Sequence, residues 1–324
     1  MKRKIFACLF LSLAFFSFHN YEYFLPSGFP KPYIPENNQL TDARIELGKK
    51  LFFDPILSRD STISCSSCHQ PQFAFTDRKK QATGIKGLKV SRNTPTLTNV
   101  AYNTSFLLDG VNPSLENQAI VPFHEKNEFD LHILIASDRL SSIDEYCILS
   151  EKAYGQKPSP YVITSSLAAF QRTLISGNSK YDKFINQKNK TIFSNFEKEG
   201  KKLFFEKLYC SECHSGFNFT NGALVNNGLY TTYKDSGRIR LTHLESDRAI
   251  FKVPTLRNIG VTYPYMHDGS FETLEDVIIH YMNGGKEHEN KSNIIKPFKI
   301  SQQEIKQLVA FLNTLTDSTF INNY

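Results

Sequence analysis

Two clusters of cysteine and histidine in this chain have a spacing that could hold a redox cofactor. Each is a Cys-x-x-Cys-His motif, and the residues are Cys65, Cys68 and His69 in one and Cys210, Cys213 and His214 in the other. A disulfide between cysteines so close together would close a very short loop and leave the adjacent histidine unexplained. The motifs therefore predict two covalently attached c-type haems, each with thiols on the vinyl groups and histidine as an axial iron ligand.

The sequence around these motifs is duplicated. Residues 48–54 (GKKLFFD) recur as 200–206 (GKKLFFE), and 95–100 (PTLTNV) match 254–259 (PTLRNI) at an offset of 159 residues. Apolar residues recur at helical spacing in the segments that follow, while alternating, strand-like segments are few. We therefore predict a mostly α fold: two cytochrome c-like helical domains, related by internal duplication, with one haem each.

The N-terminus predicts export. Lys2, Arg3 and Lys4 precede an apolar run over 5–18, which is too short for a comfortable membrane span. We predict a signal peptide over 1–20, an N-terminal domain over 21–176 and a C-terminal domain over 177–324. The protein is expected in the periplasm or otherwise outside the cytoplasm, and the sequence leaves open whether it stays tethered to a membrane.

The charge balance gives no sign of a nucleic-acid partner. Lysine and arginine number 38 against 32 aspartates and glutamates, a formal net charge of +6. Without the three basic residues of the signal segment the counts are 35 and 32, which leaves +3.

The duplication also bears on the sixth iron ligand of each haem. At the offset of 159 residues, Pro122 corresponds to Tyr281. Proline cannot ligate iron through its side chain, whereas tyrosine can coordinate ferric haem. The first haem is therefore expected to be open and the second closed by Tyr281, with Met282 and Met266 as the alternatives.

Together these residues resemble the bacterial di-haem cytochrome c peroxidase family, which includes the MauG-type proteins. The resemblance covers 42–316 and is strongest in 92–96 (RNTPT) and 254–270, which contains PTLRN and PYMHDGS. It implies reduction of hydrogen peroxide at the first haem, with electrons reaching the second from a small donor such as a cytochrome c or a cupredoxin. The alternatives are a MauG-like oxidation of a protein or organic substrate, and a non-enzymatic electron carrier. A homodimer is a further expectation.

The resemblance also implies which residues face the peroxide. Gln118, Pro122 and Glu128 fall at the spacing of the family's distal glutamine, proline and glutamate. Glu128 is expected to move the proton between the peroxide oxygens, and Gln118 to hold peroxide or water by hydrogen bonding. Glu125 and Asp130 lie close by in the sequence and remain alternatives for the acid.

His124 and His132 are also near enough in the sequence to be considered as sixth ligands of the first haem. Lone histidines near a helix are more often structural groups. Family members hold a calcium ion between the haems, and the ligands implied here are the Asn93 side chain and the carbonyls of Thr262 and Pro264. Counting from Thr262 and Pro264 by the family's spacing again leads to Tyr281. At this position peroxidases usually have methionine, and MauG-type members have tyrosine.

Two positions depart from the family pattern. Ile85 stands where many peroxidases have a removable histidine ligand, so a resting state that must be reduced before it reacts is not expected. Leu108 stands at the place of the tryptophan between the haems, and the chain contains no tryptophan. This departure speaks against MauG-like long-range oxidation.

Overall fold

A computed structural model describes residues 21–186 and 191–324. The predicted signal peptide over 1–20 lies outside these residues. Within them, no helix is both long and apolar enough to cross a lipid bilayer.

Helices dominate the structure, as predicted. The α-helices of the N-terminal half are α1 (Asp42–Phe53), α2 (Cys65–Cys68), α3 (Leu115–Ala119), α4 (Val121–His124), α5 (Ile133–Ser141), α6 (Asp144–Tyr154) and α7 (Pro160–Arg172). Those of the C-terminal half are α8 (Lys180–Asn186), α9 (Asn195–Lys202), α10 (Ile239–Thr242), α11 (Leu274–Met282), α12 (Gln302–Asn313) and α13 (Ser318–Asn322). The strands of the described residues are β1 (Leu224–Val225) and β2 (Phe251–Lys252), which pair antiparallel.

The duplication is visible in how the longest helices cross. Helix α1 packs on α7 in the N-terminal half, and α9 packs on α12 in the C-terminal half. A Cβ atom added to Gly48 of α1 would lie 1.9 Å from the Ser166 carbonyl oxygen of α7. One added to Gly200 of α9 would lie 1.9 Å from the Gln307 carbonyl oxygen of α12. Only glycine permits such close backbones, so the repeated glycine builds the same crossing twice.

Local sequence signals set the start of the helices that carry this packing. Helix α12 begins with a Ser-x-x-Glu capping box: the Ser301 hydroxyl accepts from the Glu304 backbone N–H, and the Glu304 carboxylate accepts from the Ser301 backbone N–H. Helix α9 begins with the same arrangement at Ser194 and Glu197. Because α9 and α12 cross each other at Gly200, the two caps help to fix where these helices begin relative to the crossing.

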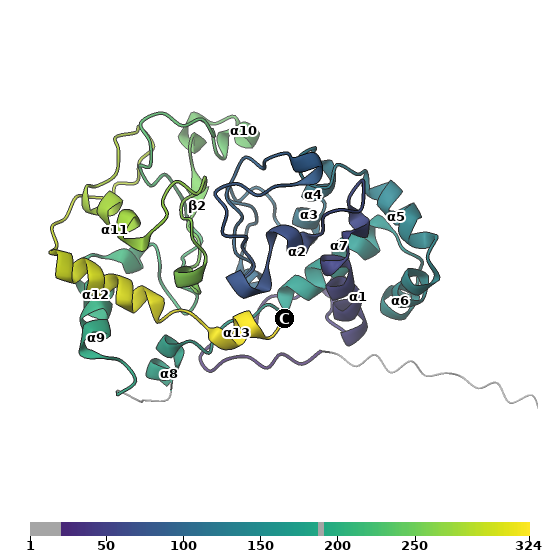
Figure 1. The fold of residues 1–324 in the computed structure, drawn as a ribbon, viewed down its shortest axis with the longest axis horizontal. Coiled ribbons are helices and arrows are strands. Elements are labelled where there is room, and N and C mark those ends of the chain that lie inside the picture. The colour runs from purple at the N-terminus through teal and green to yellow at the C-terminus, as the bar shows by residue number, and fades with distance from the viewer. Residues whose placement is uncertain (1–20, 187–190) are drawn as a thin grey trace, which may run out of the picture.

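Each half has its own hydrophobic core, and Figure 1 shows the halves side by side, with α1–α7 in one and α9–α12 in the other. Helix α13 is an exception, because its Phe320 is buried in the first core, with its ring 5.7 Å from that of Phe75. The end of the chain therefore closes over the N-terminal half. The domain boundary between 176 and 177 stays a prediction.

A buried ionic network joins the halves. Arg92 contacts Asp109 at 2.7 Å within the N-terminal half and Asp235 at 2.6 Å across the interface. Arg240, from the C-terminal half, also contacts Asp109 at 2.7 Å. Asp109 is fully buried. A buried carboxylate shared by two guanidinium groups is costly to disrupt, so this network helps to hold the facing surfaces in register.

Candidate haem-binding site

A cavity of about 1020 Å³ runs between the two halves and is lined by both Cys-x-x-Cys-His motifs. The four thiols of these motifs are not paired in disulfides. Most of the other residues that line the cavity are apolar. This combination of free thiols, imidazoles and an apolar enclosure fits two covalently attached macrocycles.

Helix α2 holds the first motif. Its single turn is closed by a capping box in which Ser64 and Ser67 bond each other's backbone N–H groups. His69 follows directly, and its Nδ1 lies 2.8 Å from the Phe75 carbonyl oxygen. A hydrogen bond at Nδ1 orients the ring and leaves Nε2 available to a metal. Burial lowers the pKa of His69, which favours the neutral imidazole that a metal requires.

The second motif repeats this geometry with different backbone. A 3-10 turn spans Cys210–Glu212, and the Nδ1 of His214 lies 3.2 Å from the Phe219 carbonyl oxygen. Burial lowers the pKa of His214 to about 4. Phe219 has a positive φ of 51°, as Phe75 does at 62°. In both halves, then, a phenylalanine with a left-handed backbone conformation directs its carbonyl oxygen toward the histidine of the motif.

Three side chains from the N-terminal half that were predicted to face peroxide line this cavity. Gln118 on α3, Pro122 on α4 and Glu128 in the loop after α4 all line the cavity. Burial, and next the charge of Glu125, raise the pKa of Glu128 to about 7. Glu128 is therefore able to carry a proton or to release one near neutral pH.

The neighbouring acids face elsewhere. Glu125 is exposed and does not line the cavity. Asp130 forms an ion pair with Arg59 at 2.8 Å, and this pair is the main cause of its lowered pKa. Of the three acids considered from the sequence, the structure brings only Glu128 to the cavity.

The loop that contains Ile85 holds Glu128 in place. A Cβ atom added to Gly84 would lie 1.8 Å from the Asn127 carbonyl oxygen, and the Ile85 N–H donates to the Glu128 carbonyl oxygen at 3.4 Å. Ile85 itself is fully buried and does not line the cavity. At this position the chain has an apolar packing residue in place of a side chain that could ligate iron.

The two histidines considered for the first haem lie on the surface. His124 and His132 are exposed, with ring centroids 6.0 Å apart, and neither lines the cavity. The Nδ1 of His132 accepts from the Leu134 N–H at the start of α5. Its position is that of a helix cap.

The structure distinguishes the candidate ligands of the second haem by whether they line the cavity. Tyr281 and Met266 line the cavity, whereas Met282 packs against the second core. Burial is the largest cause that raises the pKa of Tyr281, to about 12. The Met266 sulfur accepts a hydrogen bond from the side-chain amide of Asn227 at 3.3 Å.

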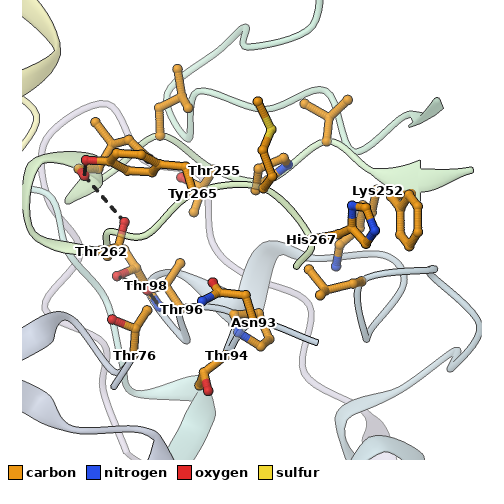
Figure 2. Close-up of a pocket in the computed structure, with 18 of the residues that line it drawn as sticks. Thr76, Asn93, Thr94, Thr96, Thr98, Lys252, Thr255, Thr262, Tyr265 and His267 are labelled. Atoms are coloured by element: carbon orange, nitrogen blue, oxygen red, sulfur yellow. Dashed lines mark hydrogen bonds between the residues drawn. The ribbon is translucent and has the colours of Figure 1, made fainter. Parts of the chain in front are cut away.

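The three residues considered for calcium line the same cavity. Figure 2 shows Asn93 and Thr262 on one part of the wall, with Asn93 contributed by the N-terminal half. The Asn93 side chain donates to the Lys79 carbonyl at 2.8 Å, and its backbone N–H donates to the His267 carbonyl at 2.9 Å. No group of three or more His, Cys, Asp or Glu that could hold a metal occurs among residues 21–186 and 191–324. The proposed donors, with Pro264, are neutral oxygens, a set that a hard cation accepts.

Sequence reasoning missed Lys252 of β2. Its ammonium lines the cavity between the halves and donates to the Ser105 carbonyl at 2.6 Å. Burial lowers its pKa to about 8. The residue lies two positions before the duplicated 254–259 segment, but no local pattern indicates that it is buried.

The comparisons with known proteins agree with this geometry. Residues 42–190 match the family model described as di-haem cytochrome c peroxidase, and 197–316 match that of cytochrome c. The methylamine utilization protein MauG of Methylorubrum extorquens is 37% identical over 285 residues, 87% of this chain and 80% of that protein. The cytochrome c551 peroxidase of Nitrosomonas europaea is 34% identical over 291 residues, 88% of this chain and 82% of that protein.

Solved structures give the same picture. A MauG-like protein associated with microbial copper homeostasis superimposes with a TM-score of 0.87 at 30% identity, over 93% of this chain and 97% of that one. The diheme peroxidase BthA from Burkholderia thailandensis has a TM-score of 0.75 at 20% identity, over 92% of this chain and 95% of that one. At this identity the second comparison bears on the fold alone.

Proposed function

Since the chain belongs to the di-haem cytochrome c peroxidase and MauG family, we propose that it is an exported peroxidase that reduces hydrogen peroxide to water. The haems, when bound, supply the electrons that split the peroxide O–O bond, and a small cytochrome c or cupredoxin replaces them. The observation that carries the proposal is Glu128, a carboxyl with its pKa raised to about 7 that lines the same cavity as His69.

Glu128 and the side chains near it in the sequence have separate roles in the proposed reaction. Peroxide enters beside Gln118, whose amide orients it by hydrogen bonding. Glu128 takes the proton from one peroxide oxygen and gives it to the other, so that water leaves. Pro122 offers no ligand, and the buried Ile85 offers none either, so peroxide has access without prior reduction.

Tyr281 is our choice for the sixth ligand of the second haem. It lines the cavity, while the alternative Met282 packs against the second core and the Met266 sulfur accepts a hydrogen bond from the Asn227 side-chain amide. Asn93, with the carbonyls of Thr262 and Pro264, is our choice for a calcium site. No step of the mechanism depends on that ion.

A MauG-like oxidation is the second candidate, because Tyr281 lines the cavity and a MauG protein is among the relatives. Leu108, at the place of the family's tryptophan, also lines the cavity and offers no redox-active ring. Steady-state turnover separates the two candidates. A peroxidase oxidises a reduced cytochrome c or cupredoxin continuously with peroxide, whereas a MauG-like enzyme oxidises it poorly and consumes peroxide only with an aromatic or protein substrate.

The experiment that tests the proposal is stopped-flow absorption spectroscopy of the fully ferric protein mixed with one equivalent of hydrogen peroxide. A fast change at a high-spin haem without prior reduction is expected. An inert ferric protein that becomes reactive only after partial reduction contradicts an open first haem, and one that stays inert after reduction contradicts the peroxidase.

A further inference from the structure

A column of aromatic rings runs from the cavity wall toward the surface of the C-terminal half. Phe251 and His267 both line the cavity, and their rings are stacked with centroids 4.1 Å apart and planes at 19°. Tyr233 follows at 5.9 Å from His267, and Tyr230 at 5.5 Å from Tyr233. Both tyrosines are partly exposed. The rings therefore form an unbroken series of contacts between the haem cavity and solvent.

The inner end of the column lies beside the position where the family's tryptophan is missing. The Lys252 backbone N–H donates to the Leu108 carbonyl at 2.7 Å, which brings the adjacent Phe251 next to that segment. Figure 2 shows His267 and Lys252 together on the cavity wall. Phe251 and His267 line the same cavity as Tyr281. The column is thus near both the interface between the halves and the proposed second haem.

The two tyrosines differ in what receives their hydroxyl proton. The Tyr233 hydroxyl donates to the Asn226 side-chain carbonyl at 3.1 Å, and an amide is not a base. The Tyr230 hydroxyl donates to a carboxylate oxygen of Asp268 at 2.7 Å. The other oxygen of Asp268 accepts from the Ser270 backbone N–H at 3.1 Å, which fixes the carboxylate.

This difference matters because a phenol is far easier to oxidise when its proton leaves together with the electron. Tyr230 has a carboxylate in hydrogen-bond contact that can take that proton, so Tyr230 is the residue of the column that can hold the oxidising equivalent. Within residues 21–186 and 191–324, no carboxylate accepts a hydrogen bond from the Tyr233 hydroxyl, so Tyr233, His267 and Phe251 serve as the path between the cavity and Tyr230.

We propose that Tyr230 is a redox-active residue that is oxidised through the Phe251, His267 and Tyr233 column after the haems react with peroxide. The inference rests on the peroxide reaction proposed above. Tyr230 gives one electron to the peroxide-oxidised haem pair and its hydroxyl proton to Asp268, which leaves a neutral tyrosyl radical and a carboxylic acid. An external one-electron donor then returns the electron, and the proton moves back to the phenol.

The test is electron paramagnetic resonance of the ferric holoprotein, freeze-quenched after one equivalent of hydrogen peroxide. An organic radical is expected whose spectrum narrows when the protein carries ring-deuterated tyrosine. In Tyr230→Phe the tyrosine signal is expected to be lost. Asp268→Asn keeps the ring and the Ser270 contact but removes the base, so the radical yield should fall about tenfold or more, given that a positioned proton acceptor contributes roughly 10²–10⁴ in rate.

Tyr146→Phe is the matched control. Its hydroxyl donates to the Asp54 carboxylate at 2.6 Å, but the residue lies in the first core and does not line the cavity. This variant should keep the full radical yield. If the haem signal responds to peroxide but no tyrosyl radical forms, the inference is wrong while the peroxide reaction stands. The same holds if a tyrosyl radical forms and its yield is unchanged in both Tyr230→Phe and Asp268→Asn. A ferric haem signal that peroxide leaves unchanged overturns the peroxide reaction and the inference with it.

Discussion

Replacing Glu128 by glutamine tests the proposed proton transfer most directly. Glutamine keeps the shape and a hydrogen-bonding oxygen but cannot exchange a proton with peroxide. A positioned acid–base group contributes roughly 10²–10⁴ in rate, so the reaction of the ferric protein with peroxide should slow by that factor, a barrier increase of about 3 to 5 kcal/mol. Stopped-flow measurement at pH 8, where the Glu128 carboxylate is available as base, gives the ratio.

The pH dependence gives a second and sharper signature. Burial and the charge of Glu125 raise the pKa of Glu128 from 4.5 to about 7. The rate in the native protein should therefore rise with pH through about 7 and then level off, and in Glu128→Gln it should lose this dependence. Glu125→Gln is the control: removing its charge lowers the pKa of Glu128, so the midpoint should move to lower pH while the plateau stays. A Glu128→Gln variant within a factor of about two of the native rate would refute the role.

The same shift predicts a stability effect with a definite sign. The folded state holds the Glu128 proton up to about pH 7, whereas the unfolded chain releases it near 4.5. Stability is therefore lost as the pH rises between these values, by at most about 3 kcal/mol and by less because the side chain is partly exposed. Glu128→Gln should be more stable than the native protein at pH 8 and equal to it below pH 4.5, as measured by denaturant unfolding. Equal stability at both pH values would contradict the shifted pKa.

Three further substitutions follow from the geometry. Tyr281→Phe should abolish any ferric tyrosinate absorption and raise the reduction potential of the second haem, as spectroelectrochemistry can show; an unchanged potential and spectrum contradict Tyr281 as a ligand. Gly200→Ala places a methyl group 1.9 Å from the Gln307 carbonyl oxygen, so unfolding in denaturant should show a loss of about 3 kcal/mol or more; a loss within about 0.5 kcal/mol contradicts the close crossing. Asp109→Ala leaves Arg92 without its buried partner and should cost about 3–5 kcal/mol in the same assay, whereas an unchanged midpoint shows that the network is not needed.

Much of the fold could be predicted because its signals are local or repeated. The helical class follows from apolar spacing, and the start of α12 from the Ser301 and Glu304 capping box. The duplication could be recognised because Gly48 and Gly200 stand in the same short sequence. The role of these two glycines could not, since it depends on a helix more than a hundred residues away. The return of Phe320 to the first core has no sequence signal either, because a short amphipathic helix can pack on either half.

The sequence by itself determined which residues could attach haem, because Cys-x-x-Cys-His is a chemistry of adjacent side chains that needs no distant partner. It also determined membership in the family, since the spacing of conspicuous residues survives in the linear order. The tertiary structure decided which of several neighbouring residues face the cavity: Glu128 and not Glu125, Tyr281 and not Met282. It alone revealed the column that ends at Tyr230. Burial, ring stacking and pKa shifts arise from packing between segments far apart in the chain, and no local pattern of residue types encodes them.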